Sequence, residues 1–259
     1  MNNSEILSAK KIVTEGIWYH CIDFEGSTSK GTFDYRNLIY DLNIPDMSNN
    51  TVLDVGCSDG FFTLHFLKKL NAKKVTGVDI NKYDGSIAFE VLNTYEDDYK
   101  EKYNNQNDFN LLIDEYKNLG LDNPNKFLLL KKIFNLNTEF VEGSIYDLSH
   151  LNSHDITFCG SLLEHLRDPI TAIEQMYLKT NKFCLIDVSN SFNSSFFSSN
   201  KNYLKYTGSG GNFYHYSTNA VKSMMENIGF KEVKIIKKYK IKIEKYGYKI
   251  PHFLIIGYK

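Results

Sequence analysis

The fold is decided by Val52-Leu53-Asp54-Val55-Gly56-Cys57-Ser58-Asp59-Gly60, where a short apolar run passes directly into a glycine-containing turn. Val52–Val55 has the length and composition of a buried strand, and Phe61–Leu70 has the apolar spacing of a helix. Glycines at such a turn let the backbone approach a ligand closely, and the N-terminus of the helix offers free N–H groups. The stretch therefore predicts a strand, a ligand-binding loop and a helix in succession.

The same alternation of short apolar runs and amphipathic stretches continues along the chain. Further strands are predicted at Lys74–Ile80, Thr138–Glu142, Asp155–Cys159, Lys182–Val188, Val233–Lys237 and His252–Tyr258, and helices near Pro169–Lys179 and Thr218–Ile228. This rhythm predicts an α/β fold with a Rossmann-like, seven-stranded, mostly parallel sheet and helices on both faces. Gly247 and Pro251 separate the last two strands, which favours an antiparallel C-terminal hairpin at the sheet edge.

Three regions stand outside this alternation. Residues 1–50 precede the first strand and are rich in aromatic side chains, so we expect an N-terminal aromatic cap on a core formed by residues 51–259. Residues 93–127 are rich in Asn and in charge, and they predict a helical insertion between the second and third strands. Residues 189–216 form a long polar and aromatic stretch that we expect to be a lid loop, because long loops are often functional.

The composition disfavours several classes of protein. The 259 residues carry 30 Lys and Arg against 31 Asp and Glu, a net charge of −1 that gives no overall attraction to nucleic acid or membrane. Arginine, which suits bidentate phosphate binding, occurs only at Arg36 and Arg167. The four cysteines are far apart, so we expect buried, reduced thiols and no metal site. No apolar run is long enough to span a bilayer and the N-terminus is polar, so we expect a cytoplasmic protein.

Residues after the second and third strands indicate the ligand of the glycine turn. Asp79 ends the second strand, where a carboxylate can accept hydrogen bonds from both hydroxyls of an adenosine ribose. Ser144 and Ile145 follow the third strand, where an adenine edge would lie. The order and spacing of these elements are more specific than any one of them.

The glycine turn itself disfavours a dinucleotide. It lacks the full dinucleotide glycine spacing, and Asp59 would repel a pyrophosphate. An acidic turn of this kind suits a ligand with a zwitterionic amino-acid end. The fourth strand runs into a polar loop that begins at Gly160 and includes Glu164 and His165.

In these elements the sequence resembles the class I S-adenosylmethionine-dependent methyltransferases. Val52–Gly60 is similar to their first motif, Asp79 to their ribose-binding acid, Ser144-Ile145 to their adenine-contact pair, and Asp155–Pro169 to their fourth motif. The resemblance implies S-adenosyl-L-methionine as the cofactor, with no metal required. The residues that it assigns to the cofactor are Asp54, Gly56, Cys57, Ser58, Gly60, Phe61, Asp79, Ile80, Ser144, Ile145 and Gly160.

Within that class the chain is similar to the branch that contains the tRNA wobble-uridine carboxymethyltransferases and bacterial tailoring O-methyltransferases. The similarity rests on Trp18-Tyr19-His20, Gly31–Asp34, Asn212–Ser217 and the form of the fourth motif, and it spans roughly residues 16–236. The wobble-uridine enzymes have a Tyr before the His of the fourth motif, whereas this chain has Glu164. Because an acid repels a carboxylated cofactor, ordinary S-adenosylmethionine is the expected donor.

Methyl transfer to a hydroxyl is helped by a base within hydrogen-bond reach, and His is the commonest choice near neutral pH. The candidates for catalysis are His165, His20 and Glu164. The candidates for substrate contact are Trp18, Tyr19 and His215. Each histidine could instead bond a backbone carbonyl, and the two aromatic residues could pack in the core.

The resemblance implies a methyltransferase, and we expect O-methylation of a small-molecule hydroxyl on a secondary metabolite or sugar. One alternative is a tRNA-modifying enzyme; the near-neutral charge argues against it, while the Lys-rich stretch at Lys231–Lys249 keeps it open. A second alternative is a module that binds S-adenosylmethionine without catalysis. The sequence does not indicate the oligomeric state.

Overall fold

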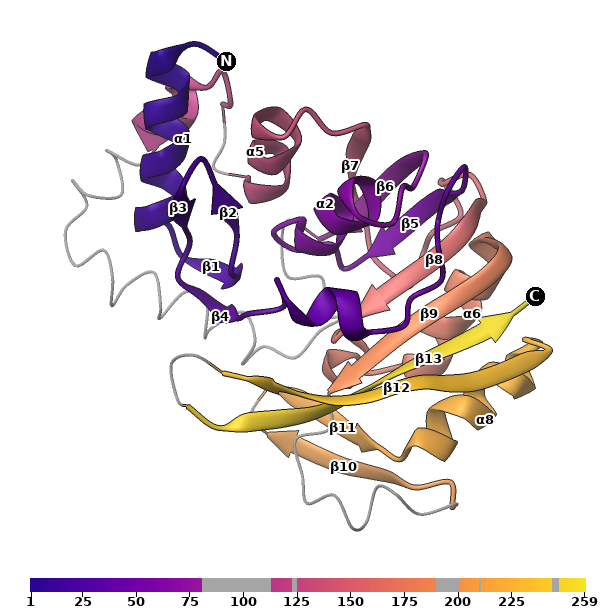
Figure 1. Ribbon diagram of the computed structural model, residues 1–259. Coiled ribbons are helices and arrows are strands. Elements are labelled where there is room, and N and C mark those ends of the chain that lie inside the picture. The colour runs from indigo at the N-terminus through magenta and orange to yellow at the C-terminus, as the bar shows by residue number, and fades with distance from the viewer. Residues whose placement is uncertain (81–112, 123–124, 190–200, 210, 244–246) are drawn as a thin grey trace.

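Seven strands form one central sheet in the computed structural model (Figure 1), which describes residues 1–80, 113–122, 125–189, 201–209, 211–243 and 247–259. They are β5 (Thr51–Val55), β6 (Lys74–Asp79), β7 (Thr138–Glu142), β8 (His154–Gly160), β9 (Thr180–Ser189), β12 (Glu232–Lys242) and β13 (Lys249–Tyr258). Each contains or closely overlaps one of the apolar runs that predicted a strand. The seven predicted strands are therefore confirmed.

The strands lie in the order β12-β13-β9-β8-β5-β6-β7. β5 pairs in parallel with β6 and β8, and β7 and β9 extend the parallel sheet on the two sides. β13 runs antiparallel to both β9 and β12, so the mostly parallel sheet and its C-terminal hairpin are confirmed. Because the chain passes from β5 to β6 on one side and later to β8 on the other, the carboxyl end of β5 is the topological switch point, where open α/β sheets bind ligands.

Helices cover both faces of the sheet, as predicted. They are α2 (Phe61–Lys68) and α5 (Lys126–Ile133) on one face, and α6 (Pro169–Lys179) and α8 (Thr218–Ile228) on the other (Figure 1). Successive strand residues point to opposite faces, so each strand contributes to two separate cores. Val52 lies in the core that contains α2, and its neighbour Leu53 lies in the core that contains α6.

Capping residues explain why α6 and α8 have the predicted bounds. The Asp168 side chain accepts a hydrogen bond from the backbone three residues on, and Pro169 occupies the first turn of α6. Ser217 caps α8 in the same way, and the helix ends at Gly229, whose φ is +127°. Both helix starts are therefore encoded locally.

Residues 1–50 contain more regular structure than predicted. They form α1 (Asn3–Glu15), β1 (Trp18–His20), β2 (Asp23–Phe24), β3 (Ser27–Thr28), β4 (Gly31–Phe33) and the 3-10 helix η1 (Leu38–Asp41). A capping box begins α1, because Asn2 and Glu5 each accept a hydrogen bond from the backbone N–H of the other. β1 pairs in parallel with β4, and β2 pairs antiparallel with β3.

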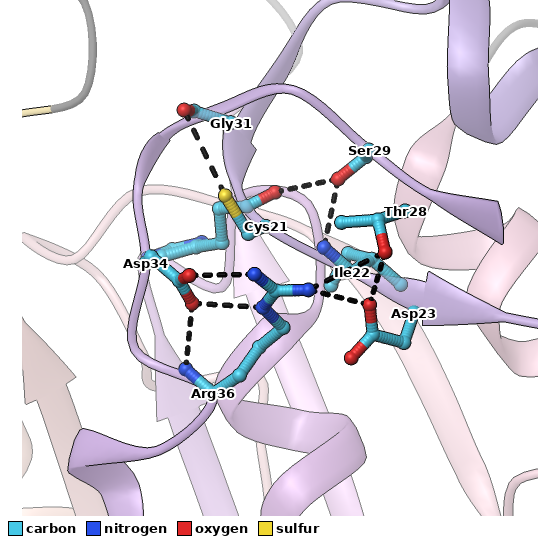
Figure 2. A network of polar contacts seen from close by, with 9 residues as sticks. Cys21, Ile22, Asp23, Thr28, Ser29, Gly31, Asp34 and Arg36 are labelled. Atoms are coloured by element: carbon cyan, nitrogen blue, oxygen red, sulfur yellow. Dashed lines mark hydrogen bonds and ion pairs between the residues drawn. The ribbon is translucent and has the colours of Figure 1, made fainter. Parts of the chain in front are cut away.

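A polar network fixes the segment between β1 and β4 (Figure 2). Ser29 Oγ donates to the carbonyl of His20 at 3.1 Å. The Arg36 guanidinium donates two hydrogen bonds to Asp34, at 2.8 and 2.6 Å, and a third to Asp23 at 2.5 Å. These contacts join both ends of the segment, so they hold His20 at a defined position.

Two predicted regions lie only partly within the described residues. Of the insertion at 93–127, residues 93–112 and 123–124 lie outside them. Of the lid loop at 189–216, residues 190–200 and 210 lie outside, and the remainder includes β10 (Leu204–Ser209) and β11 (Asn212–Tyr216). These two strands pair antiparallel, with Tyr206 opposite Tyr214, so this part is a hairpin and not an irregular loop.

Three further observations concern the class of protein. All four cysteines are buried, as expected. Among the described residues, no helix combines the length and the apolar composition needed to cross a membrane. In the same part of the chain, no group of three or more His, Cys, Asp or Glu side chains is arranged to hold a metal ion.

Candidate active site

The glycine turn lies at the carboxyl end of β5, at the switch point of the sheet. Gly56, Ser58 and Gly60 have φ values of +73°, +47° and +83°, which is the left-handed region that glycine adopts without strain. The Gly56 N–H donates to the carbonyl of Val78 at 2.8 Å, so the turn is tied to β6. A Cβ on Gly56 would lie 2.6 Å from a side-chain carbon of Leu162, which shows how closely the turn approaches the loop after β8.

Asp79 is held at the end of β6 by two backbone hydrogen bonds. Its carboxylate accepts from Ser58 N at 2.7 Å and from Ile80 N at 2.8 Å. Burial raises the pKa of Asp79, and these two bonds offset part of that increase. Each carboxylate oxygen has a further lone pair, so the group can accept hydrogen bonds from a diol.

The residues assigned to the adenine lie next to Asp79. Gly143 N donates to the Asp79 carbonyl at 2.9 Å, and this bond brings the end of β7 beside the end of β6. Ser144 and Ile145 follow directly; Ile145 is buried, and Ser144 Oγ accepts from a backbone N–H two residues on. Ile80 is half-buried beside them. The structure therefore brings these predicted residues to one edge of the sheet.

Four other predicted cofactor residues lie in the turn or in the elements next to it. Asp54 is buried and accepts a 2.6 Å hydrogen bond from the hydroxyl of Thr63, and burial raises its pKa to about 7. Cys57 is buried, and burial raises the pKa of its thiol. Phe61 is fully buried at the start of α2. At the end of β8, a Cβ on Gly160 would lie 2.8 Å from a ring carbon of its neighbour two residues back.

These groups fit S-adenosylmethionine. Asp79 has a carboxylate that could accept hydrogen bonds from the ribose hydroxyls, and Gly56 and Gly60 have no side chains that would keep a ligand from the backbone. When bound, S-adenosylmethionine supplies a methyl group made electrophilic by the sulfonium charge. The residues of this site would then have to bind it, align the acceptor and exclude water.

His20 and Asp59 form a buried pair above the glycine turn. His20 Nδ1 lies 2.7 Å from Asp59 Oδ1, and the His20 backbone N–H donates to Asp59 Oδ2 at 2.8 Å. The His20 ring stacks on Phe61 with 4.8 Å between centroids. Burial raises the pKa of Asp59, but the charge and hydrogen bonds of His20 outweigh it and hold that pKa below its ordinary value. The N-terminal segment is thereby bonded directly to the glycine turn.

The two polar residues of the fourth motif have different environments. Glu164 is 1% exposed, and its Oε1 accepts hydrogen bonds from the backbone N–H and the hydroxyl of Ser189. His165 is half-buried, and its Nδ1 lies 2.7 Å from the carbonyl of Gly211, before β11. His165 therefore makes the backbone contact that was the structural alternative for it.

The three residues predicted to contact substrate have different environments. Trp18 is buried and donates its indole N–H to the carbonyl of Ile12 in α1, so it packs beneath that helix. His215 is buried on β11, where burial lowers its pKa. Tyr19 is half-buried; burial and the negative charges of Glu164, Asp59 and Asp187 raise its pKa. Their contact with substrate stays a prediction.

Sequence reasoning missed a second buried histidine–carboxylate pair. His252 Nδ1 lies 3.1 Å from Asp187 Oδ2, and Tyr239 donates to Asp187 Oδ1 at 2.7 Å. The Ser161 hydroxyl also donates to Asp187, at 3.1 Å. The available signal was a polar residue inside each of two strongly apolar strands, β9 and β13.

The fold and this site define a class I S-adenosylmethionine-dependent methyltransferase. The profile of the family described as "Methyltransferase domain" matches residues 35–235, and the chain belongs to that family. The protein is therefore an enzyme whose cofactor is S-adenosylmethionine. This family match favours an enzyme over the alternative of a module that binds S-adenosylmethionine without catalysis.

Solved structures with a similar fold have low sequence identity to this chain. The N-terminal domain of EvdMO1, determined in the presence of SAH and D-fucose, matches with a TM-score of 0.60 and 14% identity over 100% of this chain and 97% of that chain. Complete EvdMO1 gives a TM-score of 0.56 and 14% identity, over 100% of this chain and 48% of its own length. The YcgJ protein from Bacillus subtilis matches with a TM-score of 0.50 and 14% identity, over 86% of this chain and 96% of that chain. No sequence among the curated proteins matches the chain.

Proposed function

We propose that the enzyme methylates a hydroxyl group of a small polar molecule and that His20 is the base. The observation that carries the proposal is the 2.7 Å contact between His20 Nδ1 and Asp59 Oδ1. An ionised carboxylate only accepts hydrogen bonds, so in the neutral form of His20 Nδ1 keeps its hydrogen and Nε2 carries the lone pair. Nε2 can then accept the hydroxyl proton, while Asp59 stabilises the imidazolium that forms.

The position of His20 supports this role. Asp59 binds its backbone as well as its ring, and Ser29 binds its carbonyl, so the side chain is held rigidly. Asp59 is itself part of the glycine turn, so the base is fixed relative to the backbone that we assign to the cofactor. Fixed alignment of acceptor, methyl group and base is the main contribution that a protein makes to such a displacement.

His165 and His215 are weaker candidates for the base. His165 Nδ1 is bonded to a neutral carbonyl, that of Gly211, which stabilises an imidazolium less than a carboxylate does. His215 lies close to Lys205, and both burial and that positive charge disfavour a protonated imidazole. We assign Glu164 to orienting the acceptor, since its buried side chain is fixed by Ser189.

Two observations favour a small polyhydroxylated acceptor over tRNA. The EvdMO1 domain of similar fold was determined in the presence of D-fucose, a small sugar, which supports this acceptor class. Arg36, one of the two arginines, is paired with Asp34 and Asp23, so its donors are already used inside the protein.

The test is methyl transfer from S-adenosylmethionine to a panel of acceptors, with the formation of S-adenosylhomocysteine measured as the readout. The panel contains hexoses, 6-deoxyhexoses, phenols and primary amines, with bulk tRNA at low salt. We expect turnover with hydroxyl compounds and an O-methyl signal in the NMR spectrum of the product. Transfer only to amines or only to tRNA would contradict the proposal, as would binding of the cofactor without transfer to any hydroxyl.

A further inference from the structure

Two buried polar atoms on the acceptor side of the site have no hydrogen-bond partner among the described residues. They are Glu164 Oε2 and His252 Nε2, on side chains whose residues are 1% and 4% exposed. Both residues are otherwise firmly held, Glu164 by Ser189 and His252 by Asp187. Buried polar atoms are nearly always hydrogen-bonded, because burial without a partner is unfavourable. Two such atoms, on side chains that both adjoin Ser189, therefore point to a ligand that supplies the partners.

The register of the sheet brings these residues together. Ser189 on β9 lies directly opposite His252 on β13, and His252 lies opposite Tyr239 on β12. Directly opposed residues have side chains on the same face of a sheet, about 5 Å apart at Cβ. Because Glu164 is bonded to Ser189, its carboxylate lies beside the row formed by Ser189, His252 and Tyr239.

The same row faces the proposed base. Tyr35 lies between the two histidines, with its ring centroid 5.6 Å from that of His20 and 6.4 Å from that of His252. Its hydroxyl lies 3.4 Å from the Tyr239 hydroxyl and 3.5 Å from His252 Nδ1. The two histidine–carboxylate pairs are thus linked through one buried tyrosine.

The chemistry of the two atoms defines their partner. The shortest contact of His252 Nδ1 is to the Asp187 carboxylate, which only accepts, so Nδ1 carries the hydrogen and Nε2 is an acceptor. Glu164 Oε2 is also an acceptor. A ligand that satisfies both must present two donors, and neighbouring hydroxyl groups of a sugar do so.

We propose that His252 and Glu164 bind hydroxyl groups of the acceptor next to the one that is methylated, and so select a polyol with adjacent hydroxyls. This proposal rests on the function proposed above, and it adds a specificity determinant formed by residues outside the glycine turn. Asp187 and Tyr239 act as positioning residues, because they fix the orientation of the His252 ring.

The test uses one isosteric substitution, Glu164→Gln, and one that shortens the side chain, His252→Asn. His252→Asn keeps an amide N–H where Nδ1 donates to Asp187 and removes Nε2. Glu164→Gln keeps an oxygen for Ser189 and replaces the second acceptor by a donor. The matched control is His154→Asn, since His154 is a buried histidine of β8 whose two ring nitrogens both have partners.

Two readouts separate this proposal from the proposed function. Binding of 6-deoxyhexoses and their mono-deoxy analogues is measured by NMR on protein saturated with S-adenosylhomocysteine, and KM and kcat are measured for the same sugars and for a simple phenol. We expect His252→Asn and Glu164→Gln to weaken sugar binding and raise the sugar KM by at least about tenfold, a larger increase than for the phenol, and to leave cofactor affinity unchanged. Each variant is expected to lose discrimination against one deoxy analogue.

Equal sugar binding in the wild type and both variants would overturn this proposal, even if hydroxyls are methylated. So would failure of every sugar to bind while a phenol is methylated, a result that leaves the proposed function intact. Absence of transfer to any hydroxyl contradicts the proposed function instead, and the NMR binding data then decide this proposal separately. The control is expected to lose thermal stability without a change in sugar selectivity.

Discussion

The cofactor side and the acceptor side of the site are built in different ways. On the cofactor side, β5, the glycine turn, α2 and β6 follow one another in the chain, and the principal contacts are backbone groups around Asp79. On the acceptor side, His20, Glu164, Asp187 and His252 come from separate segments and meet through side-chain contacts, and His20 is joined to the glycine turn through Asp59. A local motif therefore forms the side that we assign to the cofactor, whereas tertiary contacts assemble the side that we assign to the acceptor.

Two aspartates of the segment Val52–Gly60, Asp54 in β5 and Asp59 in the glycine turn, show this difference. Asp54 is bonded to a hydroxyl and its pKa is raised to about 7, since burial dominates. Asp59, five positions on, is bonded to His20 and its pKa is lowered. The contact with a histidine from a distant segment reverses the effect of burial.

The largest effect is expected from removing the proposed base. His20→Asn keeps a donor for Asp59 and removes Nε2, so kcat should fall by about 10² to 10⁴. The affinity for S-adenosylmethionine, measured by calorimetry, should not change, because His20 belongs to the acceptor side. A wild-type kcat in this variant would contradict the assignment of His20 as the base and would favour His165 instead.

The next effect is a change in stability with pH that depends on Asp54. The folded-state pKa of Asp54, about 7, lies above an unfolded value of about 3.9. Asp54 contributes at most about 4 kcal/mol to the free energy of unfolding. This contribution is fully present below the unfolded pKa and is lost as pH rises through the folded pKa of about 7. Urea unfolding at pH 5 and pH 8 should show this loss in the wild type and not in Asp54→Asn. Parallel pH profiles for the two proteins would refute it.

A smaller effect is expected at the ribose-binding position. Asp79→Asn loses a charged acceptor and should weaken S-adenosylmethionine binding by about 1.5–3 kcal/mol, because hydrogen bonds to charged groups have that magnitude. The KM for S-adenosylmethionine should rise, while kcat at saturating cofactor stays near the wild-type value. A change in the acceptor KM alone would contradict the assignment of Asp79 to the cofactor side.

The smallest effect is expected in the network of Figure 2. Arg36→Lys cannot form the two parallel hydrogen bonds to Asp34, so the free energy of unfolding should fall by about 1 kcal/mol or less. If this network holds His20 in place, kcat should fall slightly while cofactor affinity stays constant. Steady-state kinetics and thermal unfolding measure the two effects, and loss of cofactor affinity would argue against the assignment.

Local signals explain what could be predicted from the sequence. The strands follow from apolar runs of the right length, and the bounds of α6 and α8 follow from Asp168-Pro169, Ser217 and Gly229. The glycine turn and Asp79 are likewise contained in two neighbouring strands. Each of these features depends on residues that are close in the chain.

Features that depend on tertiary contacts were missed or differently interpreted. Asp59 was interpreted as a group that repels pyrophosphate and suits a zwitterionic ligand, and its contact with His20 was missed because nothing in the linear sequence links two residues 39 positions apart. The pairing of Asp187 with His252 spans 65 positions and depends on the register of β9 and β13. The capping box at Asn2 and Glu5 was a local signal for α1 that could have been used.

The bond between Tyr35 and His252 joins positions 217 residues apart, whereas β5 and β6 are joined by a short connection. Contacts between distant segments form late in folding, since the entropy of closing a long loop must be overcome first. We therefore expect refolding to regain S-adenosylmethionine binding before methyl transfer. A partly folded chain would then hold its methyl donor while it is still unable to use it.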